Sequence, residues 1–155
     1  MKVQLFEQSV VLASDQFWEQ MLAMKLDVMS TAEDFHAGAG HVSGAVVLTG
    51  VWNGRIEVRM AGGLAYQATA AMMMQAVEGV VESDVLDAAK EIANMLAGTI
   101  KSSLPRPCSM TVPESALAQE SFDGPAATGD ALVVGFRHAA GDLMVRIWEQ
   151  EYLEC

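Results

Sequence analysis

The sequence is poor in basic residues. Only 9 Lys and Arg stand against 20 Asp and Glu, so the formal net charge of the 155 residues is −11. A protein this acidic is repelled by a phosphate backbone and by an anionic bilayer unless a local basic patch intervenes, and its basic residues are scattered. No stretch interleaves them with aromatic residues, as single-stranded nucleic-acid binders require. The sequence therefore predicts no nucleic-acid partner and no membrane partner.

Long apolar runs and paired cysteines are also lacking. No uninterrupted run of 18 apolar residues is present, and charged and amide residues interrupt the N-terminus too early for a signal peptide. The two cysteines, Cys108 and Cys155, match no disulfide framework by number or spacing, so we predict two free thiols. These absences favour a cytoplasmic protein.

Apolar residues are plentiful enough for a core. Hydrophobic residues make up 52% of the chain and charged residues 19%, a balance that excludes intrinsic disorder. A chain of 155 residues is close to the usual size of one domain. We therefore predict a single globular domain spanning residues 1–155.

The clearest structural signal is a β-hairpin. Two β-prone runs, 42–52 and 55–60, are joined by Asn53-Gly54, a dipeptide that suits a type I′ turn. The second run alternates between apolar and charged residues, which predicts one buried face and one wet face. The apolar residues are Ile56, Val58 and Met60, and the charged ones are Arg55, Glu57 and Arg59.

The remaining elements follow from periodicity and turn residues. In the first part of the chain we predict helical structure over 6–25, in one or two pieces with Ser14 or Asp15 as an internal cap, then an extended stretch over 26–31 and a loop over 32–40. After the hairpin we predict a helix over 64–77 and a second helix, which Ser83 or Asp84 caps and Leu104-Pro105 ends. The rest is predicted as an extended stretch over 105–120, a loop over 121–130, and strands over 131–138 and 143–151. This order predicts an α+β fold with a mixed or antiparallel sheet covered by long helices.

Three consecutive methionines, Met72–Met74, lie in the helix predicted over 64–77. Such a cluster can bind a metal or form an apolar groove that binds a partner. Methionine is more often a gap-filler in cores, and we therefore predict that this helix packs on the sheet through them.

Histidine and cysteine give weak candidates for chemistry. His36 and His41 lie in a glycine-bearing loop without a cysteine pair or an H-E-x-x-H motif, so no metal site is predicted there. A nucleophile pair of Cys108 and His138 is conceivable, because such partners need not be adjacent in sequence, but a cysteine after Pro107 at a strand start is more typical of an inert thiol. No phosphate-binding loop supports nucleotide binding.

The predicted helix that Ser83 or Asp84 would cap carries a polar stripe. At 100° per residue, Asp87, Glu91 and Asn94 fall within about 60° of one another, and Gly98 continues the line. A solvated face is the ordinary explanation, yet asparagine is a mediocre helix former and glycine costs about 1 kcal/mol relative to alanine. Glycine at this position would let another backbone approach closely. The opposite side carries the core stripe of Val85, Ala89, Ile92, Leu96 and Ile100.

These residues carry a family resemblance. The segment from Asp87 through Glu91 and Asn94 to Gly98, with Pro113 further on, resembles the signature of the CheX, CheC and FliY chemotaxis phosphatases, which is Asp or Ser, three residues, Glu, two residues, Asn and a later Pro. The interval to Pro113 is shorter than is usual in the family. The hairpin and the early helix also match, so nearly all of the chain is covered, and CheX is the most similar branch.

The early helix carries no second signature. It has Ser14, Trp18 and Met21 at the corresponding intervals, where the Glu and Asn of two-site members would stand. We therefore expect one site per chain.

The resemblance implies that the protein hydrolyses the aspartyl phosphate of CheY-like receiver domains. The receiver would supply the phosphate, Mg²⁺ and a lysine, so the protein would need no cofactor or metal of its own. In-line phosphoryl transfer depends mainly on orientation and charge placement, and Asn94 would orient the attacking water. Glu91 would pair with the receiver's lysine, and Asp87 and Gly98 would serve docking. CheX-like proteins are dimers, so the resemblance also implies a homodimer.

Two alternatives remain open. One is a non-catalytic module of the same fold that binds a receiver or a sister subunit without hydrolysis, as flagellar switch proteins do. The other is a purely structural helix face, with a methionine-rich surface that serves oligomerisation.

Overall fold

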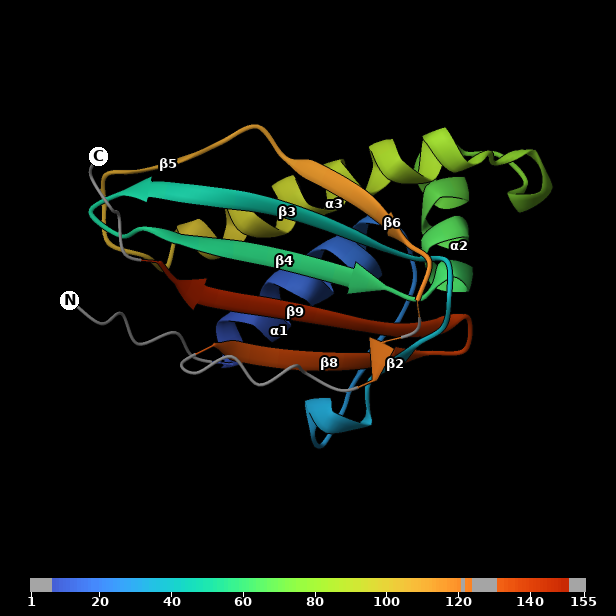
Figure 1. Ribbon diagram of the computed structural model, residues 1–155, viewed down its shortest axis with the longest axis horizontal. Helices are drawn as coiled ribbons and strands as arrows, with labels where there is room; N and C mark the ends of the chain where they lie inside the picture. The colour runs from blue at the N-terminus through green and yellow to red at the C-terminus, as the bar shows by residue number, and fades with distance from the viewer. Residues whose placement is uncertain (1–6, 121, 124–130, 151–155) are drawn as a thin grey trace.

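An antiparallel sheet and three α-helices make up most of the chain (Figure 1). The computed structural model describes residues 7–120, 122–123 and 131–150, so most of the predicted loop over 121–130 and Cys155 lie outside the described residues. The elements are α1 (Glu7–Asp15), η1 (Gln16–Met21), β1 (Asp27–Val28), η2 (Ala32–Asp34), β2 (His36–Ala37), β3 (His41–Gly50), β4 (Gly54–Met60), α2 (Gly62–Met73), η3 (Val77–Gly79), α3 (Glu82–Lys101), β5 (Cys108–Met110), β6 (Glu114–Ala118), β7 (Phe122–Asp123), β8 (Leu132–His138) and β9 (Gly141–Glu149).

The main sheet has the strand order β1-β8-β9-β4-β3-β5, and β6 also pairs with β3. Every pairing within the described ranges is antiparallel. The predicted extended stretch over 105–120 is confirmed, because β5 and β6 pair with successive parts of the free edge of β3. The strands predicted near the C-terminus are confirmed as β8 and β9.

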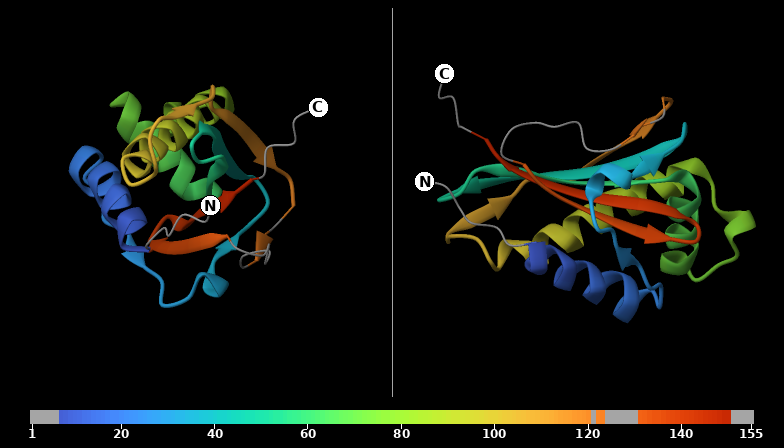
Figure 2. Two further views of the ribbon diagram at one scale, coloured as in Figure 1. Left: turned by 90° about the vertical axis from the view of Figure 1, so that its left-hand side faces the viewer. Right: turned by 90° about the horizontal axis from the view of Figure 1, so that it is seen from below.

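Two helices, α1 and α3, lie on the same face of the sheet, while α2 stands at one end of it (Figures 1 and 2). The core lies between these helices and the sheet, and it includes the predicted stripe of β4, Ile56, Val58 and Met60. The predicted α+β class, with a sheet covered by long helices, is confirmed.

Helix α3 lies very close to β3. A Cβ atom added at Gly44 of β3 would overlap the carbonyl oxygen of Ala89 and would come within 3.2 Å of the Ala93 Cβ. Only glycine in the strand and alanine in the helix allow backbones to approach this closely. This contact fixes the height of α3 above the sheet.

The hairpin is confirmed, but its predicted turn is wrong. The chain turns over residues 51–53, and Gly54 is already paired in β4 with a φ outside the left-handed region. Gly50 adopts φ +140°, and its N–H donates to the side chain of Asn53. Two neighbours leave no room for a side chain at Gly54, namely the ring of buried Trp52 and the carbonyl oxygen of Trp148 on the paired strand β9.

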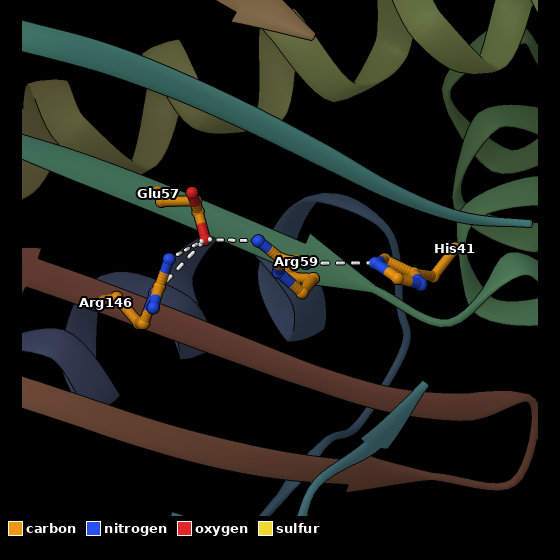
Figure 3. Close-up of polar contacts among 4 residues, drawn as sticks. All are labelled: His41, Glu57, Arg59 and Arg146. Atoms are coloured by element: carbon orange, nitrogen blue, oxygen red, sulfur yellow. Dashed lines mark hydrogen bonds and ion pairs between the residues drawn. The ribbon is translucent and has the colours of Figure 1, made fainter. Parts of the chain in front are cut away.

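The outer face of β4 is less wet than its alternating pattern predicts. Glu57 is buried, and its Oε1 accepts hydrogen bonds from Arg146 Nη2 at 2.8 Å and from Arg59 Nη2 at 3.2 Å (Figure 3). Arg59 also donates to His41 Nε2, whose Nδ1 then donates to the carbonyl of Gly38. Part of the same face is covered by a second small cluster of buried residues, Met29, Phe35, Ala37 and Met144.

The N-terminal helical region consists of two pieces, which is one of the two predicted alternatives. It changes from α-helix to a π-helical segment after Asp15, but the Asp15 side chain makes no cap hydrogen bond. The wider turn buries the adjacent rings of Phe17 and Trp18, which meet edge to face at 5.1 Å. The predicted cap is therefore wrong.

Helix α3 begins two to three residues earlier than predicted. Its N-cap is Val81, and neither Ser83 nor Asp84 occupies that position. Asp84 still contributes, because its Oδ2 accepts the Val81 N–H at 3.2 Å from the third position of the helix. The helix ends at Lys101, shortly before Leu104-Pro105.

Candidate functional site

The polar stripe of α3 faces outward, as its periodicity predicts. Asp87, Glu91, Asn94 and Gly98 are all exposed. All five residues of the opposite stripe are buried, and they are Val85, Ala89, Ile92, Leu96 and Ile100. Asp87 and Asn94 are seven residues apart, which corresponds to about 10 Å along the helix. The candidate site is therefore a rigid linear array on one helix face.

The side chains of this array have no partners within the part of the chain that the structure describes. None of the hydrogen bonds or ion pairs formed there involves Asp87, Glu91 or Asn94. A carboxylate and a carboxamide on a rigid helix, unpaired and exposed, are available to groups of another molecule. This availability distinguishes Glu91 from Glu57, which is held by two arginines.

Gly98 is the residue of the array nearest the C-terminal end of α3. A Cβ atom added there would meet only the Met110 Cε, at 4.0 Å, which is an ordinary contact. Helix packing within the chain therefore does not require glycine at this position. Pro113 lies in the short break between β5 and β6.

An open groove adjoins the array. It has a volume of about 690 Å³ and runs between η1, the end of α2 and the first half of α3. Five methionines line it, namely Met21, Met72, Met73, Met74 and Met95. Three carboxylates stand at its α3 side, namely Asp84, Asp87 and Glu91. We call these residues the methionine groove and its acidic wall.

The prediction that the three consecutive methionines fill the core is wrong for two of them. Helix α2 ends at Met73, four residues before the predicted end, so Met73 is 45% exposed and Met74 is 93% exposed. Met72 is partly buried against the core. The sequence did not predict the groove because three elements that are separate along the chain form it. The one local signal was the short connection between the second and third α-helices, whose ends lie beside the groove.

The other candidates separate in the structure. Cys108 and His138 lie on β5 and β8, with three strands between them, which corresponds to roughly 19 Å at the usual strand spacing. The Cys108 thiol is buried and donates to the carbonyl of Trp52. The conceivable nucleophile pair is therefore wrong.

The histidines are engaged in local contacts. Both ring nitrogens of His41 make hydrogen bonds, and His138 Nδ1 accepts the N–H of Ala140 at 3.0 Å. Within residues 7–120, 122–123 and 131–150, no three His, Cys, Asp or Glu side chains gather at a spacing suited to a metal ion. None of the helices in these ranges is long and apolar enough to cross a bilayer.

Solved structures share this architecture. Chemotaxis protein CheX from Vibrio vulnificus matches with a TM-score of 0.74 at 18% identity, over 95% of this chain and 97% of that chain. The CheX–CheY–BeF3–Mg²⁺ complex from Borrelia burgdorferi matches with a TM-score of 0.69 at 18% identity, over 97% and 100%. FliY from Thermotoga maritima matches with a TM-score of 0.57 at 14% identity, over 92% and 90%. At these identities the likeness is one of fold, which is that of the CheX-like and CheC-like chemotaxis proteins.

The family follows from the sequence itself. Residues 42–128, more than half of the chain, match the family described as chemotaxis phosphatase CheX, and the matched range contains the whole of α3. The chain belongs to this family. No curated protein is similar enough to count as a match.

Proposed function

We propose that the protein hydrolyses the aspartyl phosphate of CheY-like receiver domains, and that the outward face of α3 enters the receiver's site. The observation that carries this proposal is the exposed and internally unpaired array of Glu91 and Asn94, in a chain of the chemotaxis phosphatase CheX family. An enzyme that acts on the surface of another protein needs a projecting rigid element and no deep pocket of its own.

Asn94 orients the attacking water in this proposal. In-line phosphoryl transfer is accelerated mainly by positioning and charge placement. A carboxamide has both an acceptor and a donor, so it holds a water in line with the P–O bond without bringing negative charge near the phosphate. A carboxylate at the same position would repel the phosphoryl oxygens.

Glu91 lies one turn before Asn94 and pairs with the lysine of the receiver's site. A charge-assisted hydrogen bond between them would set the register of α3 over the phosphate. Asp87, a further turn away, contributes to docking, and Gly98 lets the receiver backbone approach.

The receiver binds Mg²⁺ in this scheme, and the protein supplies no cofactor. The structure of the related Borrelia burgdorferi protein, which contains CheY, BeF3 and Mg²⁺ together with CheX, supports a CheY-like partner. We further propose that the protein acts as a homodimer, which sedimentation would test.

The decisive experiment compares Asn94→Ala with the unchanged protein on a receiver loaded from acetyl phosphate. We expect phosphate release to fall by about 100-fold or more, because a misplaced nucleophile alone can cost this much. Binding to the receiver loaded with BeF3⁻ and Mg²⁺ should stay within about twofold. Glu91→Ala should weaken both binding and hydrolysis.

The matched control is Asp27→Ala, which removes an exposed side chain from β1, at the edge of the sheet opposite to the β3 side that α3 covers. It should leave hydrolysis unchanged. Full activity of Asn94→Ala would contradict the assignment of the catalytic residue. Tight receiver binding without any phosphate release by the unchanged protein would favour the non-catalytic module instead.

A further inference from the structure

The methionine groove and the proposed catalytic array share two residues. Asp87 and Glu91 belong both to the outward stripe of α3 and to the acidic wall of the groove. A partner whose phosphate lies at Asn94 and which contacts Glu91 and Asp87 is therefore also next to the groove. We infer that the groove is a docking site for the receiver domain, and that it accepts an apolar side chain flanked by lysine or arginine from the surface beside the phosphorylated aspartate. This inference rests on the proposed function.

The area that a receiver must cover reaches the groove. A specific interface buries about 800 Å² on each partner, which corresponds to a disc of roughly 16 Å radius. Asp84 lies ten residues before Asn94, which corresponds to about 15 Å along α3. A receiver centred on Asn94 therefore extends to the groove, so its specificity is decided partly there.

Charge selects the occupant. The acidic wall carries three carboxylates, and the groove floor is apolar, so the complementary surface is apolar at its centre and basic at its edge. A second copy of this chain fits poorly, because a symmetric contact would place each acidic wall against the other in a protein of net charge −11.

Met74 gives the groove a feature that packing within the chain does not explain. It ends α2 in the left-handed conformation with φ 54°, a position where glycine is favoured. Its side chain is nevertheless 93% exposed, so few contacts within the chain compensate for the strained backbone. Ala23, directly after the groove residue Leu22, has the same φ.

The strained position allows stability and docking to be separated. We expect Met74→Gly to raise the melting temperature by about 3 °C, because glycine relieves the left-handed strain. The same variant should weaken binding of the receiver loaded with BeF3⁻ and Mg²⁺ by about fivefold, and Met73→Ser combined with it should weaken binding by about tenfold, equivalent to about 1.4 kcal/mol. In turnover these losses should appear in KM, with kcat within about twofold.

The matched control is Val51→Ser. Val51 is 48% exposed, close to the 45% of Met73, but it lies in the hairpin connection and not in the groove. It should leave receiver binding unchanged. Unchanged binding by the double variant, or an equal loss with Val51→Ser, would overturn the inference. So would a shift from dimer to monomer in the double variant with receiver affinity retained, because the groove would then be a contact between copies.

Methionine methyl resonances provide an independent measurement. Addition of the BeF3⁻-loaded receiver should shift or broaden the methyl signals of Met73, Met74 and Met21. The signals of Met60 and Met144, which are at most 1% exposed, should not change. Perturbation of the buried pair alone would contradict the groove as the docking site.

The two proposals fail in different ways. If Asn94→Ala retains full activity, the catalytic assignment is wrong, and receiver binding by the Met73 and Met74 variants still tests the docking site. If the groove variants bind and turn over as the unchanged protein does, the docking site is wrong while Asn94 is still judged by its rate.

Discussion

The two faces of α3 differ in what determines their residues. The inner face is built from alanine and larger apolar side chains, and its backbone at Ala89 contacts β3 so closely that only glycine fits at position 44. The outer face carries Asp87, Glu91 and Asn94, whose side chains have no partner among the described residues. Contacts within the chain explain the inner face, whereas the three outer side chains make no hydrogen bond or ion pair among the described residues and form the surface that we propose meets the receiver.

This difference predicts opposite responses to substitution. A change on the inner face should lower the free energy of unfolding and affect activity only through stability. A change at Asp87, Glu91 or Asn94 on the outer face should alter receiver binding or hydrolysis while the free energy of unfolding stays within about 0.5 kcal/mol.

The largest effect should come from Gly44→Val. A side chain there overlaps the backbone of Ala89, so α3 would have to move away from β3 and its buried stripe would lose its close packing on the sheet. We expect the free energy of unfolding to fall by more than about 3 kcal/mol, the upper end of overpacking costs. Urea denaturation followed by circular dichroism would measure it.

The control for this variant is Gly38→Val, because a Cβ atom at Gly38 meets nothing within 4 Å. It should change the free energy of unfolding much less. Equal losses at both positions would show that the close approach of α3 to β3 is not what requires Gly44.

A second comparison sets Glu57 against Glu91. Glu57→Ala removes the acceptor shared by Arg59 and Arg146, whose side chains are only 18% and 12% exposed. We expect a loss of about 2 kcal/mol, because two cations are left close together and partly desolvated. Glu91→Ala should cost less than about 0.5 kcal/mol in the same denaturation experiment. A loss at position 91 as large as that at position 57 would contradict the unpaired state of Glu91.

The smallest effect should come from Gly98→Ala. Alanine is favoured over glycine in a helix, and the added methyl group meets only the Met110 side chain, so the free energy of unfolding should rise by about 0.5–1 kcal/mol. Receiver dephosphorylation should nevertheless fall by about fivefold, because the methyl group obstructs the approaching backbone. A stabilised variant with undiminished activity would remove Gly98 from the docking surface.

Sequence patterns predicted the faces of α3 well because helical periodicity is a local property. Each buried or exposed position of α3 named above depends on its angle around one helix axis. The hairpin strands were predicted for the same reason, since alternation and β propensity act over a few neighbouring residues.

The errors arose where distant residues decide the outcome. Glu57 is buried because Arg146, which is 89 residues later, donates to it. Gly54 belongs to β4 and not to the turn because it pairs with Glu149 of β9. Met73 and Met74 are exposed because α2 ends early. Its end lies beside η1 and α3, and an open groove lies between the three elements.

The sequence by itself determined which residues share a helix face, which strands alternate and which signature α3 carries, because these properties depend on spacing along the chain. The tertiary structure alone decided that Glu57 is paired while Glu91 has no partner among the described residues. It also decided that five methionines line one groove beside the array. Pairing and enclosure depend on distances between residues far apart in sequence, which local patterns do not contain.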